Sequence, residues 1–290
     1  MLIHRLLTGF TAILLIIGVL WLDESMGPVM IGDWQLPQGL LLAILGSIMV
    51  ALGARELCVI AEASGIRTSR GLNATACVAV MLATWLTSSD LTEQTAAALP
   101  LTTIAIMLVV SLLWFSRGQQ VQGVFASAAV VMLSSIYLGM LSGFLLLVGA
   151  ESSVWMIGVV ALIVKSCDIG AFFTGTAIGR HKLIPWLSPG KTVEGLMGGI
   201  AASMLAALIL NSIWDSPIDW WWVLAMGGLL AIVGQAGDLT MSLFKRGAGV
   251  KDSSTLLPGL GGVMDVIDSL LLTAPLAWWL IRMTPLAGCS

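Results

Sequence analysis

Long apolar runs separated by short polar segments dominate this chain. A run of about 18 apolar residues is long enough to cross the hydrocarbon core of a membrane as a helix. The spacing of the runs predicts nine spans, at about 6–22, 38–54, 72–88, 99–115, 121–149, 154–178, 193–213, 220–241 and 262–281. The predicted fold class is therefore an all-α polytopic membrane protein.

The composition agrees with this prediction and excludes several other classes. Hydrophobic residues make up 58% of the 290 residues and charged residues only 10%, whereas a soluble domain carries roughly 25% charged residues. The net charge of −3 gives no basic surface for nucleic acid. No two of the four cysteines have CxxC spacing, so the sequence supports neither a zinc site nor a disulfide framework.

The loop charges predict the orientation of the spans. The first apolar run has no Ala-x-Ala cleavage pattern after Leu22, so we interpret it as a retained span rather than a signal peptide. With the N-terminus inside, 11 of the 13 Lys and Arg residues fall in inner segments and none in outer loops. Since positive residues favour the cytoplasmic side, the N-terminus is predicted to be cytoplasmic.

Polar chemistry is concentrated in the second half of the chain. Residues 1–150 are predicted to be a scaffold of transmembrane helices with possible dimer or lipid contacts, and residues 151–290 a catalytic region. The segments 165–195, 235–252 and 258–268 carry most of the polar candidates, and the predicted topology places all three at the cytoplasmic face.

Asp168 follows an apolar run, well before the next cytoplasmic base. An ionisable residue at such depth is costly and usually faces a polar cavity or a partner. The alternative is a structural pair with Lys165, three residues earlier on the same helical face. The nearby Gly170, Gly175 and Gly179 permit neighbouring helices to approach closely.

A second candidate is the segment Leu187–Gly195. Ser188 before Pro189 suits a helix N-cap with proline in the first turn. Lys191 and Thr192 would then lie near free N–H groups that favour anions, with Glu194 in the same turn. An ordinary cap is the alternative, since the GxxxxGK[ST] pattern of a P-loop is missing.

Three carboxylates, Asp238, Asp265 and Asp268, fall near the ends of neighbouring predicted helices. Together they would form an oxygen-rich site suited to magnesium, which binds one or two carboxylates plus substrate phosphates. In the alternative interpretation, these acids pair with nearby bases, namely Lys245, Arg246 and Lys251.

These residues resemble the signature of the CDP-diacylglycerol synthase (phosphatidate cytidylyltransferase) family. That signature reads approximately S-x-x-K-R-x4-K-D-x-x-x-x-[LI]-P-G-H-G-G-x-x-D-R-x-D. The matching positions here are Ser242, Lys245, Arg246, Lys251, Asp252, Pro258, Gly259, Gly261, Gly262, Asp265 and Asp268. The segments around Asp168, Ser188 and Asp238 are also similar to motifs of this family.

The resemblance implies an enzyme that makes CDP-diacylglycerol and pyrophosphate from CTP and phosphatidate, with magnesium and with or without a second cation. It implies catalytic roles for Lys245, Arg246, Lys251 and Asp252. It implies substrate contacts for Ser188, Lys191, Thr192, Glu194, Ser242 and Asp168. It implies metal ligation by Asp238, Asp265 and Asp268. It further suggests a homodimer in contact with membrane lipids, in a bacterial inner membrane.

Two departures from the signature leave alternatives open. The signature His is Leu260 in this chain, and the signature Arg is Val266. A relative acting on another lipid or polyprenol phosphate, or a catalytically impaired paralog, would fit these departures. A transporter is a further alternative because of Asp168 and Lys165, although transporters tend to have internal repeats and midplane sites, and here the acids lie toward one face.

Overall fold

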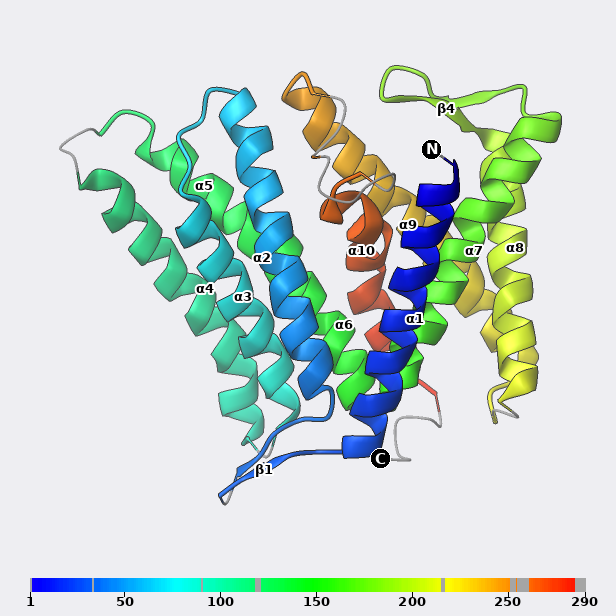
Figure 1. The fold of residues 1–290 in the computed structure, drawn as a ribbon, viewed down its shortest axis with the longest axis horizontal. Coiled ribbons are helices and arrows are strands. Elements are labelled where there is room, and N and C mark those ends of the chain that lie inside the picture. The colour runs from blue at the N-terminus through cyan, green and yellow to red at the C-terminus, as the bar shows by residue number, and fades with distance from the viewer. Residues whose placement is uncertain are drawn as a thin grey trace.

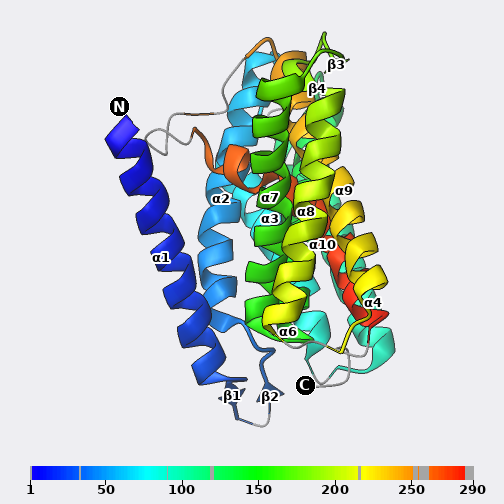
Figure 2. The ribbon, with the colours of Figure 1, turned by 90° about the vertical axis from the view of Figure 1, so that its right-hand side faces the viewer.

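The protein is a bundle of membrane-length helices, seen here in a computed structural model (Figures 1 and 2). The structure describes residues 2–32, 34–89, 91–117, 121–214, 217–250, 254 and 261–284. Within these residues, nine helical segments are long and apolar enough to cross a membrane, by length and composition. The predicted all-α polytopic fold is confirmed.

The first half of the chain forms five of these segments. A short hairpin of β1 and β2 joins the first two, and a π-helical segment interrupts the fifth between α5 and α6. The bounds are α1 Leu2–Met26, β1 Met30–Ile31, β2 Trp34–Gln35, α2 Leu40–Ala63, α3 Arg70–Trp85, α4 Glu93–Ser116, α5 Val124–Ser134, the π-helical segment Ser135–Met140 and α6 Leu141–Ala150.

The second half forms the other four segments and a second hairpin. The bounds are α7 Val154–Ile178, β3 Lys182–Ile184, β4 Ser188–Thr192, α8 Val193–Ile213, α9 Trp220–Gly247 and α10 Val263–Arg282. In Figure 1, the β3–β4 hairpin and the end of α9 lie at the end of the bundle where α1 begins, and α10 ends at the opposite end. This arrangement fits an odd number of spans.

Glycines determine how closely the last helices pack. A Cβ atom on Gly170 of α7 would overlap Ala202 of α8 and would lie 2.9 Å from the carbonyl oxygen of Gly198. A Cβ on Gly237 of α9 would lie 3.1 Å from the Cα of Ser269 on α10. Without side chains at these points the backbones approach each other directly, which brings polar residues of α7, α9 and α10 within reach of one another.

Helix α2 continues to Ala63, beyond the predicted end of its span, and carries a buried acid in its last third. The Glu56 side chain is 5% exposed. Its carboxylate accepts hydrogen bonds from the backbone N–H groups of Val263 (2.9 Å) and Met264 (3.0 Å), and from Ser254 Oγ (2.6 Å). A negative charge at a helix N-terminus satisfies free N–H donors and interacts favourably with the helix dipole. Glu56 therefore fixes the beginning of α10.

Substitution of Glu56 tests this contact. We expect Glu56→Ala to lower the free energy of unfolding by about 1–3 kcal/mol for each buried donor left without an acceptor, and Glu56→Gln, which keeps one oxygen, to lower it less. Thermal unfolding of the purified protein in detergent measures the effect. Glu62→Ala is the matched control, because Glu62 lies on the same helix in an exposed ion pair with Arg70 and such pairs contribute about 0–1 kcal/mol. Equal losses in the Glu56 and Glu62 variants would contradict the assignment.

Candidate functional site

The β3–β4 hairpin covers the end of the α7–α8 pair and positions the start of α8. The strands pair antiparallel, with Lys182 opposite Thr192 and Ile184 opposite Ser188. The predicted N-cap at Ser188 is wrong, because Ser188 begins β4 and the cap of α8 is Thr192, whose Oγ1 accepts the N–H of Gly195 at 3.1 Å. Pairing with β3 keeps residues 188–192 extended, an effect that the local Ser-Pro pattern does not reveal.

Glu194 ties the hairpin to the end of α7. Its carboxylate accepts the backbone N–H groups of Arg180 (3.1 Å) and His181 (3.2 Å) and lies 2.6 Å from His181 Nδ1. The structure thus gives both Thr192 and Glu194 a part in shaping the hairpin, and their predicted substrate contacts stay predictions.

Lys191 reaches from β4 across to α9. Its ammonium group forms an ion pair with Asp238 and donates a hydrogen bond to Gln235 Oε1 at 2.9 Å. The Gln235 side chain is buried, and its Nε2 donates to Asp168 Oδ1 at 2.9 Å. One amide therefore bridges a base from the hairpin and an acid from α7.

Lys165 extends the network to α10. Its Nζ donates to Asp168 Oδ2 at 3.2 Å and to Ser269 Oγ at 2.8 Å. The pair that the three-residue spacing predicts is confirmed, and it belongs to a larger network. Charged and amide groups that share hydrogen bonds in an apolar bundle can be retained there because each one has a partner.

Asp238 and Asp268 both lie where α9 crosses α10. The close contact at Gly237 brings α9 against the backbone of Asp268 and Ser269, and the two carboxylates lie within electrostatic reach of each other. Asp268 is 4% exposed, and its Oδ1 accepts a hydrogen bond from the backbone N–H of the next residue, Ser269, at 2.6 Å. A buried acid with a second, partly exposed acid near it favours a cation in the vicinity.

The partners of Asp265 include Lys245 and the backbone of Gly262. Its Oδ1 accepts from Lys245 Nζ at 2.7 Å, and its Oδ2 accepts the N–H of Gly262 at 3.1 Å. The alternative pairing of the acids with nearby bases therefore holds for Asp265 and Lys245, whereas Asp238 pairs with a base some 45 residues away in sequence.

The remaining predicted residues fall into two groups. Ser242 and Arg246 lie on α9 before its end, the first half-buried and the second exposed. Lys251 and Asp252 lie outside the described residues, so their catalytic roles stay predictions.

A cavity of about 490 Å³ opens beneath the hairpin. Its size falls in the range of small-molecule sites, roughly 300–1,000 Å³. The polar side chains in its wall include Asp168, Lys191, Gln235 and Asp238, and its apolar lining includes Phe172 and Leu183. A space lined by both charged and apolar side chains suits a ligand with a charged and an apolar part.

Metal ligation is compatible with part of the predicted set. Among the described residues, no three His, Cys, Asp or Glu side chains form a group that could hold a metal by themselves. Magnesium needs only one or two carboxylates when phosphates of a substrate supply the remaining oxygens. Asp268 would fit such an ion directly, while Asp238 and Asp265 would have to exchange their lysine partners, Lys191 and Lys245, for it.

Sequence reasoning missed two members of the network, Gln235 and Ser269. A signal for Gln235 was present, because it lies one helical turn before Asp238 in an otherwise apolar span. Ser269 had no comparable signal, since serine is common within helices and its role depends on the crossing of α7 and α10.

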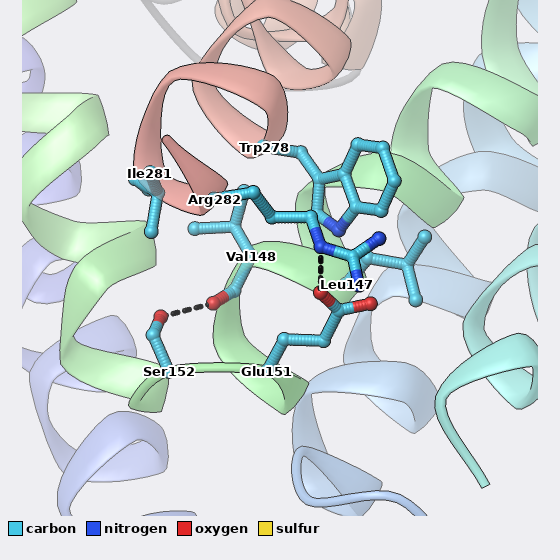
Figure 3. A pocket seen from close by; sticks show the side chains of 7 residues that line it. All are labelled: Leu147, Val148, Glu151, Ser152, Trp278, Ile281 and Arg282. Atoms are coloured by element: carbon cyan, nitrogen blue, oxygen red, sulfur yellow. Dashed lines mark hydrogen bonds and ion pairs between the residues drawn. The ribbon is translucent and has the colours of Figure 1, made fainter. Parts of the chain in front are cut away.

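An ion pair holds the end of α10 at the opposite end of the bundle. Figure 3 shows Arg282 of α10 against Glu151, with 3.4 Å between Arg282 Nε and Glu151 Oε2, and beside the ring of Trp278. The pocket between these side chains has a volume of about 10 Å³, at the lower limit of what one water molecule needs. These groups anchor the end of α10 and do not form a substrate site.

Comparison with known proteins gives a family match over nearly the whole chain. The model of the family described as "Cytidylyltransferase family" matches residues 3–284. An uncharacterized protein of Escherichia coli K12, YnbB, is 48% identical over 118 residues, which cover 41% of this chain and 39% of that protein.

Two relatives carry a functional name. The phosphatidate cytidylyltransferase of Staphylococcus saprophyticus is 40% identical over 153 residues, 52% of this chain and 58% of the relative. That of Bacillus subtilis is 34% identical over 182 residues, 62% of this chain and 68% of the relative. The matched stretches thus span less than two thirds of the first two relatives.

The contact at Gly170 can be tested by adding one methyl group. We expect Gly170→Ala to lower the free energy of unfolding by about 1–3 kcal/mol, because the methyl group would force α7 away from α8. Thermal unfolding in detergent measures this. The control is Gly71→Ala on α3, where the added Cβ meets nothing within 4 Å and the higher helix propensity of alanine should be neutral or stabilising. Unchanged stability of the Gly170 variant would mean that the helices are not in direct backbone contact.

Proposed function

The chain belongs to the cytidylyltransferase family, and from this premise we propose that it transfers a cytidylyl group from CTP to phosphatidate. The products would be CDP-diacylglycerol and pyrophosphate. The observation that carries the proposal is the convergence of Asp168, Lys191 and Asp238 in the wall of a cavity of substrate size, with the signature acid Asp268 on the neighbouring helix α10. The names of the two relatives support the choice of substrates.

The chemistry of the reaction fits the residues of the site. A phosphate oxygen of phosphatidate attacks the α-phosphorus of CTP, and the bond from that phosphorus to the bridging oxygen of pyrophosphate breaks. The attacking phosphate monoester has a second pKa of about 6, so it is largely dianionic at neutral pH and needs no strong general base. What the reaction needs is neutralisation of two anionic groups and of the charge that grows on pyrophosphate.

Basic side chains would supply part of that neutralisation. Lys191 is part of the cavity wall. Lys245 lies in the last turn of α9 and forms an ion pair with Asp265. We propose that both exchange their carboxylate partners for substrate phosphates, with Arg246, Lys251 and Asp252 acting at the same end. Ser188, Thr192, Glu194, Ser242 and Asp168 would shape the nucleotide side of the site.

Asp238 and Asp268 would hold magnesium, with Asp265 as the third predicted ligand. When bound, the ion would neutralise phosphate oxygens and the leaving group. The Asp238 carboxylate forms an ion pair with Lys191, which orients it.

The face of the membrane follows from the loop charges. Connections α2–α3 and α4–α5 and the β3–β4 hairpin lie at the same end of the bundle (Figure 1), and they carry Arg67, Arg117 and Lys182. Since positive residues favour the cytoplasmic side, we propose that the cavity opens toward the cytoplasm of a bacterial cell, in the inner membrane. CTP would then reach it directly.

Another lipid phosphate is the second candidate substrate. Val266 of α10 stands between Asp265 and Asp268 where the family signature has an arginine, so one cation beside the acids is missing. Leu260, which replaces the signature histidine, lies outside the described residues. Turnover of a different lipid phosphate together with no turnover of phosphatidate would favour this candidate.

Loss of Asp238 should abolish the activity. We expect Asp238→Asn to reduce formation of CDP-diacylglycerol by roughly 100-fold or more, the usual effect of removing one preorganised electrostatic group. The assay uses purified protein in detergent with labelled CTP, phosphatidate and magnesium. Asp219→Asn is the matched control, because Asp219 precedes the other end of the same helix. Equal activity of the two variants and the wild type would refute the assignment of Asp238.

Removal of divalent metal should have an effect of the same kind. We expect EDTA to stop turnover and added magnesium to restore it, because a divalent ion at the acids would neutralise the phosphate oxygens and the leaving group that the lysines neutralise only in part. The measurement is the initial rate before EDTA, after EDTA and after magnesium is restored. A rate that EDTA leaves unchanged would show that the acids serve another purpose.

A further inference from the structure

The π-helical segment Ser135–Met140 interrupts the fifth span between α5 and α6. Such segments are rare, and they are frequent at functional sites because the extra residue in the turn redirects side chains. This one carries Tyr137, the only tyrosine of the chain. It belongs to the first half of the molecule, which contributes none of the residues assigned to the site above.

The ring of Tyr137 is held firmly in place. The residue is 7% exposed and packs edge-on against Phe244 of α9, with ring centroids 5.3 Å apart. It shares an apolar cluster with Met241 of α9 and Met264 of α10. This packing fixes the direction of the hydroxyl group. A phenylalanine ring at this position could make the same packing contacts without a hydroxyl.

The hydroxyl group is buried and has no hydrogen-bond partner among the described residues. A buried donor without an acceptor destabilises a protein, and each one in a native structure calls for an explanation. The packing partners of Tyr137, Met241 on α9 and Met264 on α10, lie one helical turn from Asp238 and Asp268 respectively, the two acids at the crossing of these helices. The group is therefore fixed beside the site, at a cost that packing alone does not explain.

We propose that Tyr137 is a positioning residue of this site, whose hydroxyl donates a hydrogen bond to the Asp268 carboxylate when the substrates are bound. This inference rests on the function proposed above. Asp268 Oδ1 already accepts the N–H of Ser269, so Oδ2 is the acceptor that we assign to Tyr137. Hydrogen bonds of active sites are often long or misaligned without substrate and tighten in the complex. A carboxylate that binds a cation is typically oriented by such a second hydrogen bond.

The variant Tyr137→Phe separates the hydroxyl from the ring. We expect it to keep the contact with Phe244 and to melt at the same temperature as the wild type or higher without ligand, because an unsatisfied buried donor is removed. We expect kcat to fall at least about tenfold, the effect of losing one hydrogen bond to a charged group, with KM for CTP within about twofold. The rise in melting temperature on addition of CTP and magnesium should also be smaller than in the wild type.

Ser135→Ala is the matched control. Ser135 lies on the same π-helical segment, is fully buried and also has a hydroxyl without a partner among the described residues, but its neighbour is the thiol of Cys77 on α3. We expect this variant to retain wild-type turnover and the full ligand-induced rise in melting temperature. Equal losses in both variants would mean that the π-helical segment acts only through packing.

The remaining outcomes distinguish this inference from the proposed reaction. Tyr137→Phe with wild-type turnover and a wild-type thermal response overturns the role of the hydroxyl, as does a lower melting temperature without ligand. A wild-type protein that makes no CDP-diacylglycerol but is stabilised by CTP and magnesium overturns the proposed reaction. In that case a smaller ligand-induced rise in melting temperature in Tyr137→Phe supports the role of the hydroxyl, and an unchanged rise overturns it. A wild type with neither property overturns both.

Discussion

The buried carboxylate of Glu56 is the contact on which the arrangement of the site depends. It reaches from α2 in the first half of the chain to the first N–H groups of α10 in the second half. The beginning of α10 sets the position of that helix along the bundle axis and its rotation about its own axis. It therefore sets the positions of Asp265, Asp268 and Ser269. An acid in an apolar bundle is costly, so its retention at this point requires the partners that the helix N-terminus provides.

The close helix crossings are the second requirement, and they act together with Glu56. Lys165 on α7 can reach Ser269 only because the helices are in direct contact, and Asp238 lies at the same crossing as Asp268 because Gly237 leaves no side chain between α9 and α10. A network of this kind gains little from any single pair. It depends on the backbone distances being short enough that every charged group finds a partner, since one unpaired member would cost more than the others contribute.

The sequence predicts the elements of this fold better than their contacts. All nine spans were predictable, because an apolar run of sufficient length has few alternatives to a membrane helix. The pair of Lys165 and Asp168 was also predictable, since three residues on a helix bring side chains to one face. The partner of Asp238 was not, because Lys191 lies far away in sequence and is delivered by a hairpin whose strand was mistaken for a helix start. Glu56 was missed for the same reason: its partners are backbone groups of a distant helix, which no local pattern reveals.

The pairing of acids with bases in the ligand-free protein has a consequence for substrate binding. Lys191 and Lys245 each hold a carboxylate, so the charges within each of these two pairs compensate each other. A nucleotide with its cation would bring both signs of charge at once, the phosphates toward the lysines and the cation toward the acids. Each lysine–carboxylate pair would then be replaced by a lysine–phosphate pair and a cation–carboxylate pair. The low-dielectric surroundings make an unpaired charge costly, so they would disfavour the entry of phosphate or cation alone. Under the proposed reaction, the site would bind the nucleotide and the cation together.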